Sequence, residues 1–262
     1  MRYARPKFLY EDWEFNILGV YNYRKPGRLD NYFTFLIENH SYIPGDICEA
    51  GVYRGASLLA TGLLLKELGS RKIVWGFDTF QGFPQYHAND ELKTFGELRN
   101  ENKIDKGLYE KVKLYTKYKS LHAKKKLTPA NISTSGDFSQ VSMNEIKRKI
   151  QFLGLNNVRL MKGPFSKTMN TENSKIPYFC AALLDCDYYE SWKTSLFYIW
   201  EKLSLGGYVF LDEYYSLKFP GAKIAADEFF EDKKDKPQQH RHLDGDFERW
   251  FARKIFDHEA NV

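Results

Sequence analysis

Residues 45–55, with the sequence GDICEAGVYRG, constrain the fold of this chain more than any other stretch. Ile47 to Ala50 reads as a short buried strand that breaks at Gly51 and turns through Gly55 into an apolar helix over 56–68. A strand, a glycine turn and a helix N-terminus form the nucleotide-binding corner of open α/β sheets. The free N–H groups and the dipole of the helix favour negative charge there. The stretch therefore predicts an α/β fold with a ligand site at its first turn.

The acid Glu49 narrows the kind of ligand that this corner can hold. The spacing Glu49-x-Gly51-x-x-x-Gly55 is neither the dinucleotide fingerprint G-x-G-x-x-G nor the phosphate-binding loop G-x-x-x-x-G-K-[ST]. A carboxylate there repels a pyrophosphate or triphosphate and suits a cationic or zwitterionic ligand. S-adenosylmethionine, with its sulfonium and amino group, fits that description. The alternative is a buried strand acid that the backbone satisfies without any ligand.

Strands and helices alternate after this corner. Apolar segments predict strands at 47–50, 72–77, 158–161, 178–184 and 208–211, and helical spacing predicts helices at 56–68, 137–153 and 191–203. Towards the C-terminus, 224–230 looks helical and 247–256 is a candidate last strand. This alternation predicts a doubly wound, mainly parallel sheet with right-handed crossovers.

Two segments lie outside the alternation, and the whole chain, 1–262, is expected to form one domain. Residues 1–45 are expected to form an N-terminal helical layer, with a helix over 29–40. Residues 85–135 interrupt the pattern with a lysine- and tyrosine-rich insertion. The insertion is either a lid or partner-binding segment, or a solvated surface excursion, which is the common outcome for mixed charge.

Composition excludes several classes of protein. No apolar run is long enough to span a membrane, so no membrane association is expected. The three cysteines make neither a metal spacing nor a disulfide framework, which favours a reducing cytoplasm. A net charge of +5 is mild and poor evidence for nucleic acid.

Acidic residues follow three of the predicted strands. Asp78 ends the second strand, where a carboxylate usually accepts hydrogen bonds from ribose hydroxyls, although a ligand-free strand cap is the alternative. Asp185 and Asp187 follow the fourth strand, and Asp212 and Glu213 follow the fifth. If those two strands are neighbours, their carboxylates converge at the edge where such sheets bind ligands.

Converging carboxylates repel one another unless a cation neutralises them. All-oxygen ligands favour Mg²⁺ or Ca²⁺ over zinc, whereas a salt bridge or helix cap is the alternative for any single acid. A bound metal lowers the pKa of a substrate hydroxyl, and a carboxylate then takes its proton. The resulting alkoxide attacks the methyl carbon of the sulfonium.

Four motifs, in this order, carry a resemblance to a known family: 45–55, DTFQGFP at 78–84, LDCDYYES at 184–191 and GGYVFLDEY at 206–214. Together, and over about 25–258, they resemble the macrocin O-methyltransferase family. Its members are S-adenosylmethionine- and Mg²⁺-dependent enzymes that methylate sugar hydroxyls of antibiotics. The resemblance implies a Rossmann-like sheet of the class I methyltransferase type and suggests a homo-oligomer. The long 85–135 segment departs from the family pattern and falls where the family places a loop that covers the active site.

The resemblance also implies roles for individual residues. The implied cofactor-binding residues are Glu49, Ala50, Gly51, Val52 and Tyr53 at the methionine end, Gly55 in the same turn, Asp78, Thr79, Phe80, Gln81 and Gly82 at the ribose and adenosine, and Asp137, which opens the helix before the third strand. The implied metal ligands are Asp185, Asp212 and Glu213, where the family usually has Asp-Asp in place of Asp212-Glu213. Either Asp185 or Asp187 is the catalytic base; spacing does not separate them, and Asp185 is favoured as both ligand and base.

The leading hypothesis is thus an S-adenosylmethionine-dependent, metal-assisted O-methyltransferase acting on a hydroxyl of a sugar or glycosylated small molecule. One alternative keeps the methyl donor but takes nucleic acid as the acceptor, held by the lysine- and tyrosine-rich insertion. Another is a cofactor-binding protein without catalytic activity.

Overall fold

The computed structural model describes residues 8–83, 85–170, 176, 178–240 and 248–256. Parts of three sequence predictions lie outside the described residues: Pro84 of the 78–84 motif, Phe247 of the expected last strand, and 1–7 of the N-terminal layer.

The described residues form a seven-stranded sheet in the order β3-β2-β1-β4-β5-β7-β6. The strands are β1 (Asp46–Ala50), β2 (Val74–Asp78), β3 (Val158–Lys162), β4 (Phe179–Leu184), β5 (Leu203–Leu211), β6 (Gln238–Gln239) and β7 (Trp250–Arg253). The first five strands pair in parallel, whereas β7 runs antiparallel to both β5 and β6. The chain order reverses beside β1, so β1 and β4 flank a topological switch point, where open α/β sheets bind ligands. The predicted doubly wound, mainly parallel sheet is confirmed.

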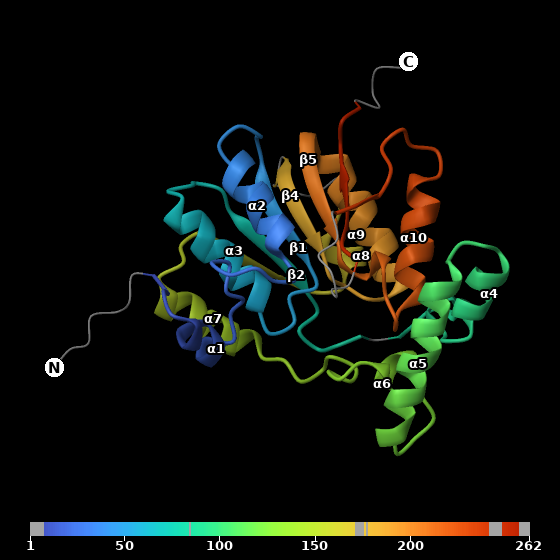
Figure 1. Ribbon diagram of the computed structural model, residues 1–262. Helices are drawn as coiled ribbons and strands as arrows, with labels where there is room; N and C mark the ends of the chain where they lie inside the picture. Colours follow the sequence, from blue (N-terminus) through green and yellow to red (C-terminus); the bar gives the residue numbers. More distant parts are fainter. Residues whose placement is uncertain (1–7, 84, 171–175, 177, 241–247, 257–262) are drawn as a thin grey trace.

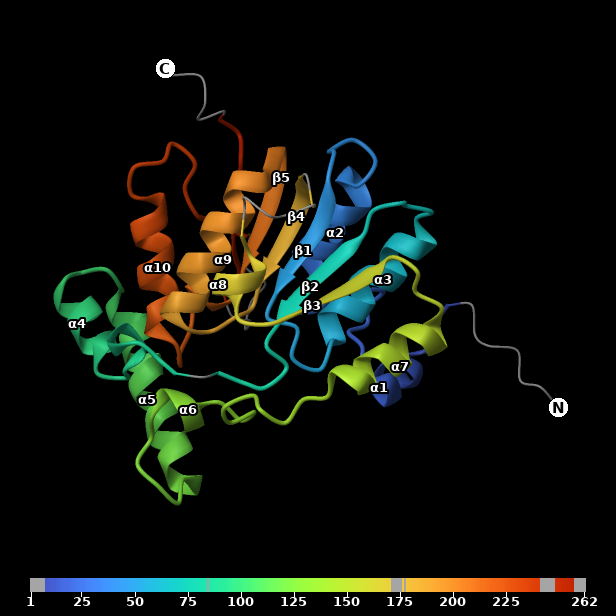
Figure 2. The same cartoon turned by 180° about the vertical axis from the view of Figure 1, so that it is seen from behind.

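Helices cover both faces of this sheet, as the opposite views of Figures 1 and 2 show. One face packs against α1 (Asp12–Leu18), α2 (Asp30–Asn39), α3 (Ala56–Glu67) and α7 (Met143–Leu153). The other packs against α8 (Phe165–Thr168), α9 (Tyr189–Lys202) and α10 (Pro220–Phe230). Neighbouring β1 residues enter opposite cores, Ile47 on the α3 side and Cys48 on the α9 side. Because both faces are covered, β4 is apolar throughout and β1 is apolar between Asp46 and Glu49, which made these strands predictable from the sequence.

Several predicted boundaries differ from the observed ones. The helix expected over 137–153 begins at Met143, because the Ser142 side chain caps it and Phe138 has a positive φ of 59° that no helix accepts. Asp137 therefore does not open this helix, and that prediction is wrong. The fifth strand begins at Leu203 rather than Tyr208, and the last strand covers only Trp250–Arg253. The short elements α1, α8 and β6 were not predicted, since their periodicity is too brief to detect.

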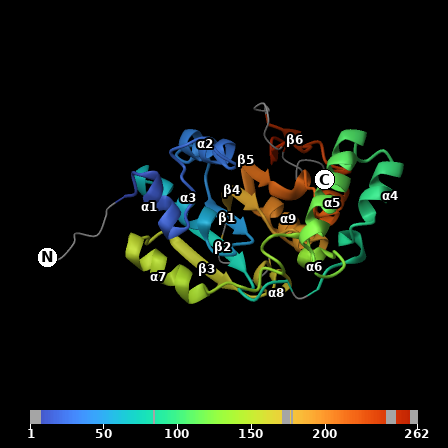
Figure 3. The same ribbon diagram turned by 60° about the horizontal axis from the view of Figure 1, so that its bottom comes forward.

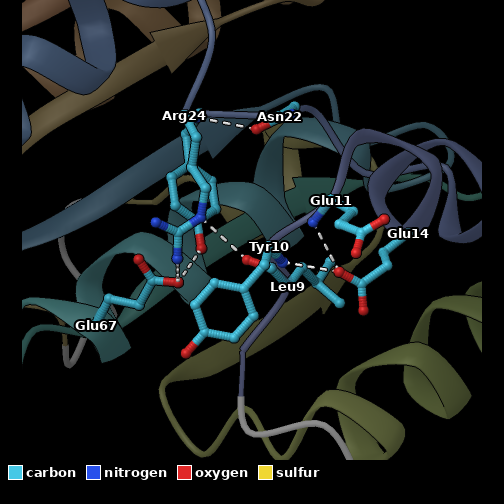
Figure 4. Close-up of polar contacts among 8 residues, drawn as sticks. Leu9, Tyr10, Glu11, Glu14, Asn22, Arg24 and Glu67 are labelled. Atoms are coloured by element: carbon cyan, nitrogen blue, oxygen red, sulfur yellow. Dashed lines mark hydrogen bonds and ion pairs between the residues drawn. The ribbon is translucent and has the colours of Figure 1, made fainter.

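The N-terminal layer is fixed to α3 by a polar cluster (Figure 4). Arg24 donates to Glu67 Oε1 at 2.6 Å and to the Leu9 carbonyl at 3.0 Å. Tyr23 donates its hydroxyl to the same Glu67 oxygen at 2.6 Å. Glu14 caps the first turn of α1 by accepting from the Glu11 and Tyr10 amides. These contacts hold the connection between α1 and α2 in place beside the sheet.

The insertion after β2 contains η1 (Ala88–Asp90), α4 (Thr94–Asn100), α5 (Lys106–His122) and α6 (Pro129–Ile132). In Figure 3 these helices lie together at the opposite end of the molecule from α1 and α7. Apolar side chains of α4 and α5 form a small core with Tyr215, which follows β5, whereas Ile132 of α6 packs with Tyr188 and Phe219. The carboxylate of Asp90, which is fully buried, accepts from the Tyr189 amide at 2.8 Å and so ties the insertion to the N-terminus of α9.

Two further sequence observations can be compared with the structure. All three cysteines are free and buried. Across the described ranges, no helix combines the length and apolar character that a membrane crossing needs.

Candidate active site

The turn after β1 approaches the end of β4 very closely. A Cβ atom on Gly51 would lie 1.8 Å from the Asp185 carbonyl oxygen, and the φ angle of Gly51 is +92°. Only glycine tolerates both the space and the conformation. Gly55, with a φ of +80°, then starts α3 as its N-cap. Gly51 is thus required by the contact between the β1 and β4 ends, whereas Gly55 is favoured by its positive φ at the start of α3.

Glu49 is fully buried, yet it is only half satisfied. Its Oε1 accepts from the Ser57 hydroxyl at 2.7 Å, whereas the buried Oε2 has no hydrogen-bond partner among the described residues. Burial raises the pKa of Glu49 well above its ordinary value. The backbone does not satisfy this acid, in contrast to the ligand-free alternative that the sequence left open. A buried, unpartnered carboxylate oxygen is a costly feature that a bound donor would relieve.

Asp78 organises the loops around the first turn. Its Oδ2 accepts from the amides of Val52 and Tyr53 at 2.8 and 2.9 Å, and its Oδ1 accepts from the Phe80 amide at 2.6 Å. The carboxylate therefore joins the loop after β1 to the loop after β2. It also lines the cavity described below, so a strand-capping role and a ligand-binding role coexist at this residue.

The acids of β4 and β5 converge as the sequence predicted. One carboxylate oxygen from each of Asp185, Asp212 and Glu213 lies within 4.8 Å of the other two. These three side chains are called the carboxylate cluster below. Glu213 accepts from the Trp192 indole at 3.1 Å and from the Asp187 amide at 3.4 Å. Burial, followed by the charge of Asp185, raises the pKa of Glu213 well above its ordinary value.

Arg28 occupies the edge of the carboxylate cluster, and sequence reasoning missed it. Its guanidinium donates to Asp185 Oδ2 at 2.5 Å and forms an ion pair with Asp212 Oδ2 at 3.1 Å. The Asp212 carboxylate is the main cause that raises the pKa of Arg28 above its ordinary value. No local signal marks Arg28, because it precedes α2 and reaches the acids only through the folded chain.

Asp187 differs from Asp185 in its surroundings. Asp187 is 4% exposed and has a φ of +59°, a conformation that few residues other than glycine adopt. Burial, and then the neighbouring Asp185 charge, raises its pKa to about 8. Asp185, in contrast, is ion-paired with Arg28. The two acids that spacing could not separate are therefore distinguished by burial and by partner.

A cavity of about 980 Å³ lies beside these groups. Ten predicted site residues line it: Gly51, Val52, Tyr53, Asp78, Thr79, Gly82, Asp185, Asp187, Asp212 and Glu213. Further lining residues that were not predicted include Tyr21, Arg28, Phe83, Phe138 and Lys218. From the insertion, only 133–135 are among the lining residues in the described part of the chain. The structure thus brings the first turn and both acid pairs to one space.

The other predicted residues stand outside the cavity lining. They are Glu49 and Ala50, which are buried in β1, Gly55, Phe80, Gln81 and Asp137. Asp137 is exposed, and its carboxylate accepts from the amide and hydroxyl of Ser139. Its carbonyl nevertheless accepts from the Phe83 amide at 3.2 Å, which places its backbone beside the loop after β2. Its contact with a cofactor stays a prediction.

Comparisons with known proteins agree with this architecture. The sequence profile of a family described as Macrocin-O-methyltransferase (TylF) matches residues 27–128 and 123–250. Demethyldecarbamoylnovobiocin O-methyltransferase from Streptomyces niveus is 27% identical over 221 residues, which are 83% of this chain and 70% of that enzyme. A tetracenomycin 4'-O-methyltransferase from Streptomyces olivaceus, whose full name includes a dimethoxy-rhamnosyl group, is 24% identical over 219 residues, 80% of this chain and 68% of that enzyme. The solved O-methyltransferase NovP superposes with a TM-score of 0.60 at 24% identity, covering 87% of this chain and 80% of NovP, and so shows a shared fold.

Proposed function

This chain belongs to the macrocin O-methyltransferase family, and on that premise we propose that it transfers a methyl group from S-adenosylmethionine to a hydroxyl of a sugar or glycosylated small molecule, assisted by a divalent cation. The observation that carries the proposal is the meeting, in one cavity, of the first-turn residues 51–53 with the carboxylate cluster. The named relatives that act on antibiotic glycosides support the choice of acceptor.

The first turn fits the methionine end of the cofactor. The buried Oε2 of Glu49 has no partner, and an acceptor of that kind favours a positively charged ligand nearby. Residues 51–53 line the cavity, and Gly51 has no Cβ, so a ligand can approach the backbone closely at this turn. Asp78 lines the same cavity, and after accepting from three amides its carboxylate keeps about one lone pair, on Oδ1, for a ribose hydroxyl. When bound, S-adenosylmethionine supplies a methyl carbon activated by its sulfonium.

The carboxylate cluster fits a hard divalent cation. Its ligands are all oxygen, they come from two adjacent strand ends, and they carry more negative charge than Arg28 alone can neutralise. Asp185, Asp212 and Glu213 would hold the ion. When bound, Mg²⁺ would supply positive charge next to the acceptor hydroxyl and lower its pKa.

Asp187 is the residue that we assign as general base. It is buried, none of the described cationic side chains forms an ion pair with it, and its raised pKa of about 8 lies near neutral pH, where a general base works best. Its carboxylate takes the proton of the acceptor hydroxyl. The acceptor oxygen would thereby become the nucleophile for the methyl group that the bound cofactor would supply. This assignment replaces the preference for Asp185 that the sequence suggested.

Calorimetric titration with S-adenosylmethionine, and with S-adenosylhomocysteine, tests the cofactor part of the proposal. We expect saturable binding of both. A panel of glycosides incubated with radiolabelled methyl donor and Mg²⁺ then tests the acceptor class. Absence of cofactor binding, with and without Mg²⁺, would falsify the proposal, whereas cofactor binding with transfer only to RNA or DNA would favour the nucleic-acid alternative.

A further inference from the structure

Among the described residues, Arg28 is the cationic side chain that forms ion pairs with the carboxylate cluster. Its guanidinium pairs with Asp185 and Asp212 but not with Glu213, whose contacts are with the neutral donors of Trp192 and the Asp187 backbone. One guanidinium thus faces three carboxylates, and Asp187 adds a fourth within two residues of Asp185. Lys218 adds positive charge near Asp187 and Arg249 near Asp212, whereas Arg28 is the cation that is ion-paired with the cluster itself.

The arginine engages two of the three side chains that would hold a metal. Its ion pairs use Oδ2 of Asp185 and Oδ2 of Asp212. A divalent cation at the cluster needs lone pairs of the same carboxylates, at distances well under 3 Å. The guanidinium and the cation would also repel each other strongly at such separations. Each aspartate keeps its Oδ1 for a cation, but the guanidinium and the cation would draw on the charge of the same two carboxylates, so the two positive ions compete at this cluster.

Arg28 lies where its side chain can move away from the cluster without a change in the core. It lies in the connection between α1 and α2, just before α2, and its side chain is 35% exposed. Its buried Nε finds no hydrogen-bond partner in the part of the chain that the structure describes, so the observed position does not satisfy all of its donors. The Tyr21 ring, 5.6 Å from the guanidinium carbon and itself exposed, offers a cation–π contact at the cavity rim. Arg24 and Tyr23 make the anchoring contacts of this connection instead.

We propose that Arg28 is an exchangeable counter-ion of the metal site: it neutralises part of the carboxylate cluster in the metal-free protein and is displaced when a divalent cation binds. Arg28 thereby sets the metal affinity, because the apparent affinity falls with the fraction of molecules whose site is free of the guanidinium. It also couples metal occupancy to the α1–α2 connection at the cavity wall. The inference rests on the metal dependence proposed above.

Mn²⁺ binding to Arg28→Met tests this exchange without relying on activity. Methionine has a similar length but no charge. We expect Arg28→Met to bind Mn²⁺ about tenfold more tightly than the wild type in calorimetric titration, since two partly exposed ion pairs no longer compete. Arg24→Met is the matched control, because Arg24 pairs with Glu67 away from the cluster, and its Mn²⁺ affinity should equal that of the wild type. Circular dichroism checks that each variant is folded.

A second measurement uses the wild-type protein alone. Phenylglyoxal modifies free guanidinium groups, and mass spectrometry locates the modified arginines. We expect saturating Mn²⁺ to accelerate modification of Arg28 several-fold and to leave Arg24 unchanged within the same sample. The proposed exchange is overturned if Arg28→Met binds Mn²⁺ with the same affinity as the wild type or with a lower one. The proposed metal site is still supported in that case. If Mn²⁺ does not change the modification rate of Arg28 in the wild type, the proposed exchange is overturned. This result holds even if Arg28→Met does not fold, because it needs only the wild-type protein. No Mn²⁺ binding in any protein overturns both proposals together.

Discussion

Glu49→Gln is predicted to stabilise the ligand-free protein while it weakens cofactor binding. The carboxylate is fully buried, with one hydrogen bond from Ser57 and one unpartnered oxygen. Glutamine keeps an acceptor for the Ser57 hydroxyl and removes the buried charge. Because an unsatisfied buried group costs more when it is charged, we expect the free energy of unfolding at pH 8 to rise by about 1–2 kcal/mol.

The pH dependence of this gain follows from the raised pKa of Glu49. A folded-state pKa above the unfolded value means that the wild type binds more protons when folded, so its stability is lost as pH rises through the folded pKa. Below the ordinary pKa of 4.5, Glu49 is protonated in both states, and the difference between the variant and the wild type should vanish. The stabilisation should therefore grow as pH increases from about 4.5.

The loss of binding follows from the same atoms. A charge-assisted hydrogen bond to the carboxylate is worth about 1.5–3 kcal/mol, so Glu49→Gln should bind S-adenosylhomocysteine about 10- to 150-fold more weakly. Urea unfolding at pH 5 and pH 8, together with calorimetric titration, measures both effects. Glu67→Gln is the control, since it makes the same chemical change at the Arg24 ion pair, outside the cavity lining. An unchanged cofactor affinity combined with lower stability at pH 8 would show that Glu49 is a structural acid and refute the reasoning.

Three further predictions concern the same site. Gly51→Ala should lower the free energy of unfolding by about 2 kcal/mol or more and abolish cofactor binding, because its Cβ would lie 1.8 Å from the Asp185 carbonyl oxygen at a positive φ. Gly69 also has a positive φ, but a Cβ there would meet no atom within 4 Å, so the control Gly69→Ala should cost about 1 kcal/mol in urea unfolding. Asp187→Asn should reduce kcat at least 100-fold and leave the dissociation constant of S-adenosylhomocysteine within about twofold, and equal kcat values would exclude Asp187 as the base. Dialysis against EDTA should abolish methyl transfer and added Mg²⁺ should restore it, and full activity after EDTA would contradict metal assistance.

The architecture was predictable because its signals are local. Continuous apolar strands buried on both faces, separated by helical periodicity, give a parallel sheet without any knowledge of tertiary contacts. The glycines at 51 and 55 and the acids at the strand ends were equally visible. Strand adjacency then follows from topology, since β4 and β5 pair in parallel and bring Asp185 close to Asp212 and Glu213. The start of α7 was not predictable in the same way, because the turn at Phe138 depends on backbone conformation rather than on apolar spacing.

By itself, the sequence determined the sheet, the position of the ligand corner, and the carboxylates that gather at its edge. Only the tertiary structure decided how those carboxylates differ from one another. Arg28 and Asp185 are 157 residues apart in the chain, and no pattern of residue spacing predicts their contact. That contact gives Asp185 a partner, while burial leaves Asp187 with a raised pKa and a different capacity for proton transfer. The physical reason is that residue type fixes which charges a chain carries, whereas burial and long-range pairing fix what each charge can do.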